Sequence, residues 1–218
     1  MKLVKILEGN FEELKKLNTN FKADTQRIRV TIDTIHEKPY YINKFPDLLF
    51  KTLQMFPNIR HHHCHQGEQV YSNRDFDIRQ LGAPIQIVGD VIDTVHLVEH
   101  ISLEIQCQLD ELDECSGLTC NYWEPENRFD VFIECRNPEI ATFSCHLAVL
   151  LSTDILEGIE SDWQVDDIID IAKIITKTNE YSLHTLAKML KWPKKKTLQN
   201  MKLLEQLYFP LPWLRSAA

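Results

Sequence analysis

Residues 96–100 read HLVEH, which places two histidines four positions apart with a glutamate before the second. Residues four apart lie on one face of an α-helix, so His96 and His100 could bind one metal ion together. Glu99 stands on an adjoining face, where it could take a proton from a metal-bound water. The order His-x-x-Glu-His is the inverted zincin motif. It predicts a Zn²⁺ site with Glu99 as the catalytic base, although a helical histidine pair is also a common structural feature.

A further metal ligand must come from outside this pair. Glu104 lies four residues beyond His100, but its backbone would be ~12 Å from that of His96 along a helix. We therefore expect Glu104 to line the cleft and not to bind the same ion. Glu134, in an expected strand, is the first choice for the third ligand. His62, His63 and Cys64 form the second choice, and their polar segment HHHCHQG could equally line the cleft as a loop.

The surrounding elements would have to position these residues. Alternating apolar residues predict strands at 24–36 and 128–135, and apolar residues at helical spacing predict helices at 47–56, about 90–109 and 139–158. The proline-containing segment 37–46 is expected to be a turn-rich connection. These elements predict an α+β domain over residues 1–160, with a small mixed sheet packed against helices.

The composition changes after residue 160. Segment 161–218 is expected to form a small helical unit of the helix-turn-helix or winged-helix kind, because two short amphipathic stretches flank KWPKK. Six lysines make its second half the cationic part of the chain, and they could contact DNA phosphates or form a solvated face. The final segment, YFPLPWLRSAA, could pack back on the body or mediate a homodimer or other partner contact.

The composition is that of a globular protein, with 44% hydrophobic and 26% charged residues. A formal charge of −8 argues against non-specific binding of nucleic acid by the chain as a whole. No segment reads as a membrane span or a signal peptide. We therefore expect a cytoplasmic protein that does not bind membranes, with its six cysteines as reduced thiols.

Four stretches, taken in order, resemble the N-terminal domain of cyanophycin synthetase. They are VTIDTIHEKPYYINKFPDLLFKTLQMFP, HHCHQG, HLVEHISLEIQ and FDVFIECRNPEIATFSCHLAVLLSTDILEG, and together they cover roughly residues 24–158. The sequence departs from that family between the cysteine loop and the motif, and again after the motif helix. Both segments would contact substrate.

The resemblance implies zinc at His96 and His100, Glu99 as the base and Glu134 as a ligand. Some members of that family cut an Asp–Arg polymer with this site. The sequence thus predicts a zinc-dependent, metallopeptidase-like hydrolase of a peptide or isopeptide-type bond, acting on an Asp–Arg polymer or another peptide. The alternative is a non-catalytic binding or regulatory module that uses its C-terminal unit to bind DNA or a protein partner.

Overall fold

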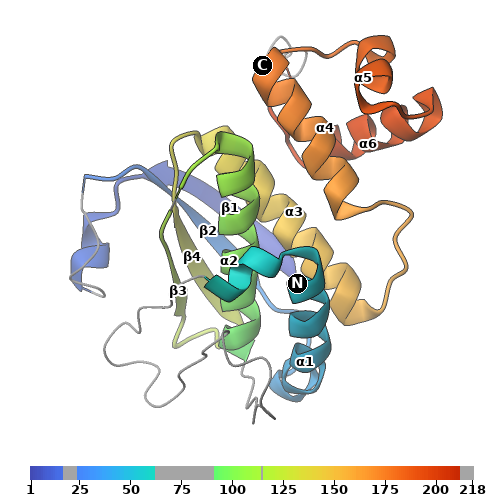
Figure 1. Cartoon of the computed structure of the whole chain (residues 1–218). Coiled ribbons are helices and arrows are strands. Elements are labelled where there is room, and N and C mark those ends of the chain that lie inside the picture. The colour runs from blue at the N-terminus through green and yellow to red at the C-terminus, as the bar shows by residue number, and fades with distance from the viewer. Residues whose placement is uncertain (17–23, 62–90, 114, 212–218) are drawn as a thin grey trace.

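The structure is a computed structural model that describes residues 1–16, 24–61, 91–113 and 115–211. These residues form a sheet with helices on one face, followed by three further helices toward the C-terminus (Figure 1). The predicted α+β class is therefore confirmed. The second-choice ligands His62, His63 and Cys64 lie outside the described residues.

The sheet consists of β1 (Lys2–Gly9), β2 (Arg27–Asp33), β3 (Gly117–Asn121) and β4 (Arg128–Glu134). Their order is β1-β2-β4-β3, and all pairings are antiparallel. Within the described residues the sheet is therefore antiparallel, and not mixed as expected. Consecutive strands pair at both ends of the sheet, and this needs no long crossover, whereas a parallel pair would need one.

Side chains alternate between the two faces of this sheet. Ile28, Val30 and Ile32 of β2 lie opposite Ile133, Val131 and Phe129 of β4, and all six belong to the main buried core. On the other face, Phe132 packs against Leu14 of a 3-10 helix, η1 (Glu12–Lys16). The helix-covered face is therefore the one that carries the odd-numbered residues of β4.

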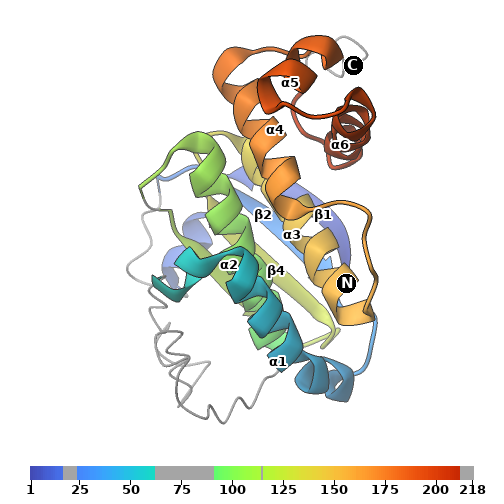
Figure 2. The ribbon, with the colours of Figure 1, turned by 45° about the vertical axis from the view of Figure 1, so that its right-hand side comes forward.

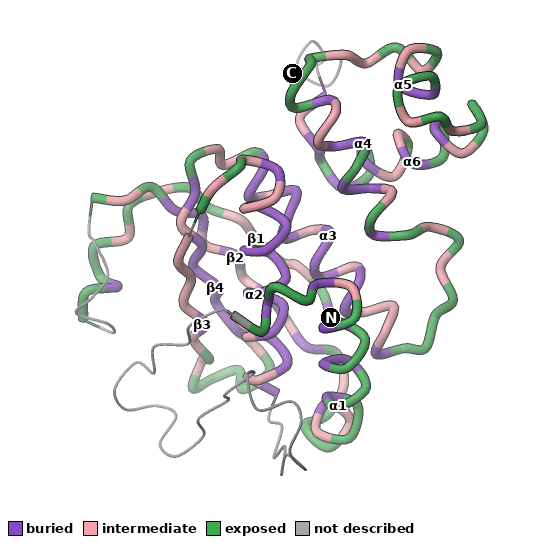
Figure 3. The backbone as a smooth tube through the Cα atoms, viewed as in Figure 1, coloured by how far each residue is buried: buried purple, intermediate pink, exposed green. Residues whose placement is uncertain are grey.

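Two long helices cover that face. Helix α2 (Val91–Asp110) packs on β3 and β4, and α3 (Pro138–Glu157) packs on β1 and β2 (Figure 2). Helix α1 (Lys38–Met55) packs against both of them and is followed by the 3-10 helix η2 (Pro57–His61). Most residues of α2 are buried (Figure 3), so the helix carrying the HLVEH motif lies in the interior.

The predicted helices at 90–109 and 139–158 are confirmed, but α1 begins earlier than expected. Pro39 suggested a turn, yet it lies in the first turn of α1, where its missing N–H would have had no helical partner. Helix α3 is long and apolar enough to cross a membrane by length and composition, but 67% of that segment is buried inside the fold. Its apolar character is accounted for by the core.

The C-terminal unit contains α4 (Val165–Thr178), α5 (Leu183–Leu190) and α6 (Lys194–Gln206), which pack on one another. No strand follows α6 within the described residues, which end at residue 211, so this part resembles a helix-turn-helix without a wing. The buried core is continuous with the first 160 residues. The Phe209 ring meets that of Phe143 edge-on at 4.9 Å, so the described part of the aromatic tail packs back on the body.

Candidate metal centre on helix α2

The two histidines of the motif face one another on α2. Their Nε2 atoms are 3.1 Å apart, and their ring centroids are 4.7 Å apart. Two nitrogen ligands of a tetrahedral zinc ion lie about 3.3 Å apart, given Zn–N bonds of about 2.0–2.1 Å. The side chains are thus already arranged close to the geometry that one zinc ion requires.

The protonation state of His96 also suits a metal. Burial lowers the pKa of His96 to about 4, because the charged imidazolium loses its hydration. His96 is therefore neutral at pH 7, and neutral imidazole is the form that binds metal. His100 is itself buried, at 6% exposure. The two Nε2 atoms are 3.1 Å apart, and two protonated nitrogens would repel at this distance. One Nε2–H can therefore donate a hydrogen bond to the other Nε2 only if that second nitrogen carries no proton.

Glu99 points toward the sheet and meets strand β3. Thr119 donates a hydrogen bond from its hydroxyl to Oε2 of Glu99. Gly117 lies so close that a β-carbon built on it would be 2.5 Å from Oε1 of Glu99. Glu99 is 3% exposed, and burial raises the pKa of its carboxyl group to about 8. A metal-free Glu99 is consequently protonated at neutral pH.

Glu134 is not brought together with the histidines. Its side chain shares a sheet face with Phe132, and α2 covers the opposite face. Ser116 donates a 2.5 Å hydrogen bond to its Oε2, and Arg27 stands opposite it on β2. Alternation along the strand explains this placement, because the neighbouring Ile133 occupies the core face.

Glu104 continues the line of His96 and His100 along α2 and is buried. Its Oε1 accepts hydrogen bonds from Nδ2 of Asn58, at 3.2 Å, and from Nε2 of Gln108, at 2.8 Å. Asn58 belongs to η2, which ends at His61, the first residue of the segment HHHCHQG. The amide contacts hold Glu104 in place one turn beyond the histidine pair.

Within the described residues, no group of three His, Cys, Asp or Glu side chains could hold a metal ion. The histidine pair could therefore supply two ligands to a metal ion, and the described part of the chain supplies no third. Sequence reasoning missed Thr119 and Gly117, which position Glu99. Both belong to a short strand that the sequence did not indicate, so no pattern in the sequence pointed to them.

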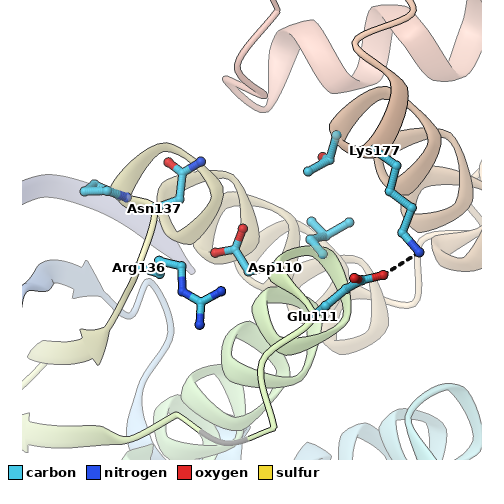
Figure 4. Close-up of a pocket in the computed structure, with 8 residues that line it drawn as sticks. Asp110, Glu111, Arg136, Asn137 and Lys177 are labelled. Carbon is cyan, nitrogen blue, oxygen red and sulfur yellow. Dashed lines mark ion pairs between the residues drawn. The ribbon is translucent and has the colours of Figure 1, made fainter.

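A cavity of about 530 Å³ lies elsewhere, beside the C-terminal end of α2 (Figure 4). It is lined by Leu109, Asp110, Glu111, Arg136, Asn137, Pro138, Thr176 and Lys177. Lys177 and Glu111 form an ion pair of 2.5 Å at its edge. Asp110 lies ten positions beyond His100 on α2, about 15 Å along the helix axis. This cavity is therefore distinct from the histidine pair.

No protein-family model matches the chain, and a search of curated proteins finds no match. The resemblance to the N-terminal domain of cyanophycin synthetase accordingly stays a prediction, based on the four stretches quoted above.

Proposed function

We propose that this protein is a zinc-dependent hydrolase of a peptide or isopeptide-type bond, with a cytoplasmic location. The observation that carries the proposal is the pair of imidazoles whose Nε2 atoms lie 3.1 Å apart on a buried helix. The helical period places the two histidines on one face, and the separation of their Nε2 atoms is close to the about 3.3 Å that two nitrogen ligands of one zinc ion require. Asp–Arg polymers and other peptides are the substrates that the sequence resemblance suggests.

His96 and His100 would hold the ion through their Nε2 atoms. Zinc bound there would lower the pKa of a water molecule to about 7 and polarise the substrate carbonyl. Glu99 would take the proton from the attacking water and pass it to the leaving amine. This role requires the ionised carboxylate, and a nearby divalent cation favours that form over the protonated one. A third ligand from His62, His63 or Cys64 remains a prediction outside the described residues.

Elemental analysis of tag-free protein tests the metal site. We expect about one equivalent of zinc in the wild type and a loss of nearly all of it in the double variant His96→Ala/His100→Ala, since two ligands disappear. His184→Ala is the matched control, because His184 is exposed on α5, and it should keep its zinc. A double variant that retains zinc, or a wild type that binds none at neutral pH, contradicts the proposal.

Glu99→Gln separates metal binding from catalysis. Glutamine keeps the shape of the side chain but cannot accept a proton from water. We expect the variant to bind zinc like the wild type while turnover of an Asp–Arg polymer or peptide substrate falls by about 10²–10⁴-fold. Normal turnover by this zinc-loaded variant would exclude Glu99 as the base.

A further inference from the structure

The second half of the C-terminal unit carries a charge opposite to that of the whole chain. Residues 182–206 contain six lysines and one acidic residue, a formal charge of +5 in a protein of −8. The lysines are Lys188, Lys191, Lys194, Lys195, Lys196 and Lys202. Such a concentration of positive charge on one small unit can attract a polyanion even though the net charge opposes it.

Helix α6 has one face in the core and one face in solvent. Thr197, Asn200 and Leu204 are buried against the rest of the unit. The opposite face presents Lys194, Lys195, Leu198, Gln199 and Lys202, all exposed. These five positions recur at helical spacing, so they form one continuous strip.

Lys196 does not belong to the strip. Its Nζ lies 2.7 Å from Oδ2 of Asp167 and 4.3 Å from the centre of the Trp192 ring. The ion pair ties the start of α6 to α4. Lys196 is therefore a structural residue, and Lys194 and Lys195 have their charges available for a partner.

The connection between α5 and α6 has the length of a helix-turn-helix turn. Three residues separate the helices, and Lys191 adopts a left-handed conformation with φ of 55°. The amide of Trp192 donates to the carbonyl of Ala187 at 3.0 Å, which closes α5. A turn of three or four residues joins the two helices of DNA-binding helix-turn-helix units.

We propose that α5 and α6 bind duplex DNA, with α6 as the helix that enters the major groove. Lys194 and Lys195 at its start contact phosphates, where the N-terminal end of the helix dipole also favours an anion. Gln199 and Leu198 on the same strip face the base edges. The wide major groove of B-form DNA admits a helix, whereas the deep and narrow major groove of duplex RNA does not.

The test measures binding of the full chain to a fluorescent DNA duplex at several salt concentrations. We expect Lys194→Gln/Lys195→Gln to weaken binding about tenfold or more and to lower the salt slope of log K by about 2, one unit for each lost phosphate contact. Lys15→Gln/Lys16→Gln is the matched control, because it removes two exposed adjacent lysines from η1. The control should bind like the wild type.

Three results would overturn this assignment: no binding of the wild type at low salt, equal losses in the two lysine variants, or equally tight binding to polyglutamate. The last would identify an acidic protein as the partner. The variant His96→Ala/His100→Ala should bind DNA unchanged, so failure of the zinc proposal and failure of this one are distinguishable.

A second observation concerns Cys107, in the last turn of α2, and Cys115, which lies between α2 and β3. The Sγ atoms of Cys107 and Cys115 lie 3.0 Å apart, and both side chains are partly exposed. Cys115 is also two residues before Gly117, the residue that contacts Glu99. A disulfide would need the sulfurs to approach by about 1 Å, to a bond of about 2.05 Å.

We infer that Cys107 and Cys115 form a reversible disulfide by exchange with a small disulfide such as oxidised glutathione. The Cys107 thiolate attacks one sulfur of the reagent, which forms a mixed disulfide and releases one glutathione thiolate. Cys115 then loses its proton to solvent and attacks the sulfur of Cys107, releasing the second glutathione. Two protein thiols are oxidised and one glutathione disulfide is reduced.

The hydrogen bond between the two thiols favours this order of attack. It lowers the pKa of Cys107 and raises that of Cys115, because a Cys107 thiolate would accept a hydrogen bond from the Cys115 thiol. Cys107 is thus the better nucleophile and Cys115 the resolving thiol.

Treatment with oxidised glutathione followed by thiol counting and mass spectrometry tests the inference. The wild type should lose two thiols and retain no glutathione, whereas Cys115→Ser should retain one glutathione on Cys107. Cys120→Ser, which removes a thiol from the other sheet face, should behave like the wild type. A loss of two thiols from Cys107→Ser, or a stable glutathione adduct on the wild type, would refute it.

Discussion

The substitution Glu99→Gln should make the metal-free protein more stable at alkaline pH relative to the wild type. Burial raises the pKa of Glu99 from 4.5 to about 8, so the folded chain keeps this proton up to about pH 8. The unfolded chain loses it above 4.5, and unfolding between these values releases a proton. Stability from this group is therefore fully present below pH 4.5 and is lost as the pH rises toward 8.

The expected size of this stability difference follows from the pKa shift of Glu99. The difference in unfolding free energy between wild type and Glu99→Gln should change by about 1.4 kcal/mol per pH unit, or about 2 kcal/mol between pH 6.5 and 8. Glutamine is neutral throughout and still accepts the hydrogen bond from Thr119, so it contributes no such slope. Urea unfolding of both proteins with a chelator present, at several pH values, provides the measurement.

Other groups also titrate, and the comparison of wild type with Glu99→Gln cancels their contributions to the unfolding free energy. Burial lowers the pKa of His96 to about 4. Between pH 4 and 6.5 the unfolded chain therefore binds a proton on His96 that the folded chain does not bind. That effect decreases stability as the pH falls from 6.5 to 4, opposite in sign to the effect of Glu99. Both proteins share it, and above pH 6.5 it vanishes. Parallel stability curves for the two proteins from pH 6.5 to 8 would show that Glu99 is ionised in the fold.

The elements with strong periodicity were predictable from the sequence. Helices α2 and α3 carry apolar residues at helical spacing, and β4 alternates Phe129, Val131 and Ile133 with other side chains. Strands β1 and β3 were not predicted. Both lie at the edges of the sheet, where polar and charged residues are tolerated and the alternation is weak.

The part of the candidate site that lies on a single helix was predictable from the sequence. The convergence of His96 and His100 follows from the period of 3.6 residues alone. The placement of Glu134 depends on which face of β4 meets the core, and the apolar residues at 131 and 133 already assign Glu134 to the other face. The contacts of Glu99 with β3 depend on how α2 lies across the sheet, which only tertiary packing determines.

Replacement of Gly117 by alanine should destabilise the fold by about 1–3 kcal/mol, the usual cost of an overpacked interior. The new β-carbon would lie 2.5 Å from Oε1 and 2.8 Å from Cδ of Glu99, both closer than such atoms approach. Thr119 holds the same carboxyl group by a hydrogen bond, so Glu99 cannot move without losing that partner. The displaced carboxyl should also reduce any hydrolytic turnover in which Glu99 takes part.

Two companion variants make the interpretation specific. Gly9→Ala is the matched control on β1, because the new β-carbon would be 3.5 Å from its nearest neighbour, an atom of Phe11. The unfolding free energy of this variant should barely differ from that of the wild type. In the Glu99→Ala background the obstructing carboxyl is gone, so Gly117→Ala should cost much less there than in the wild type. Equal costs in both backgrounds, measured by urea unfolding, would mean that Gly117 is needed for some reason other than its contact with Glu99. A cost confined to the background that retains Glu99 would establish that a glycine at this position lets the glutamate of the HLVEH motif lie against the sheet.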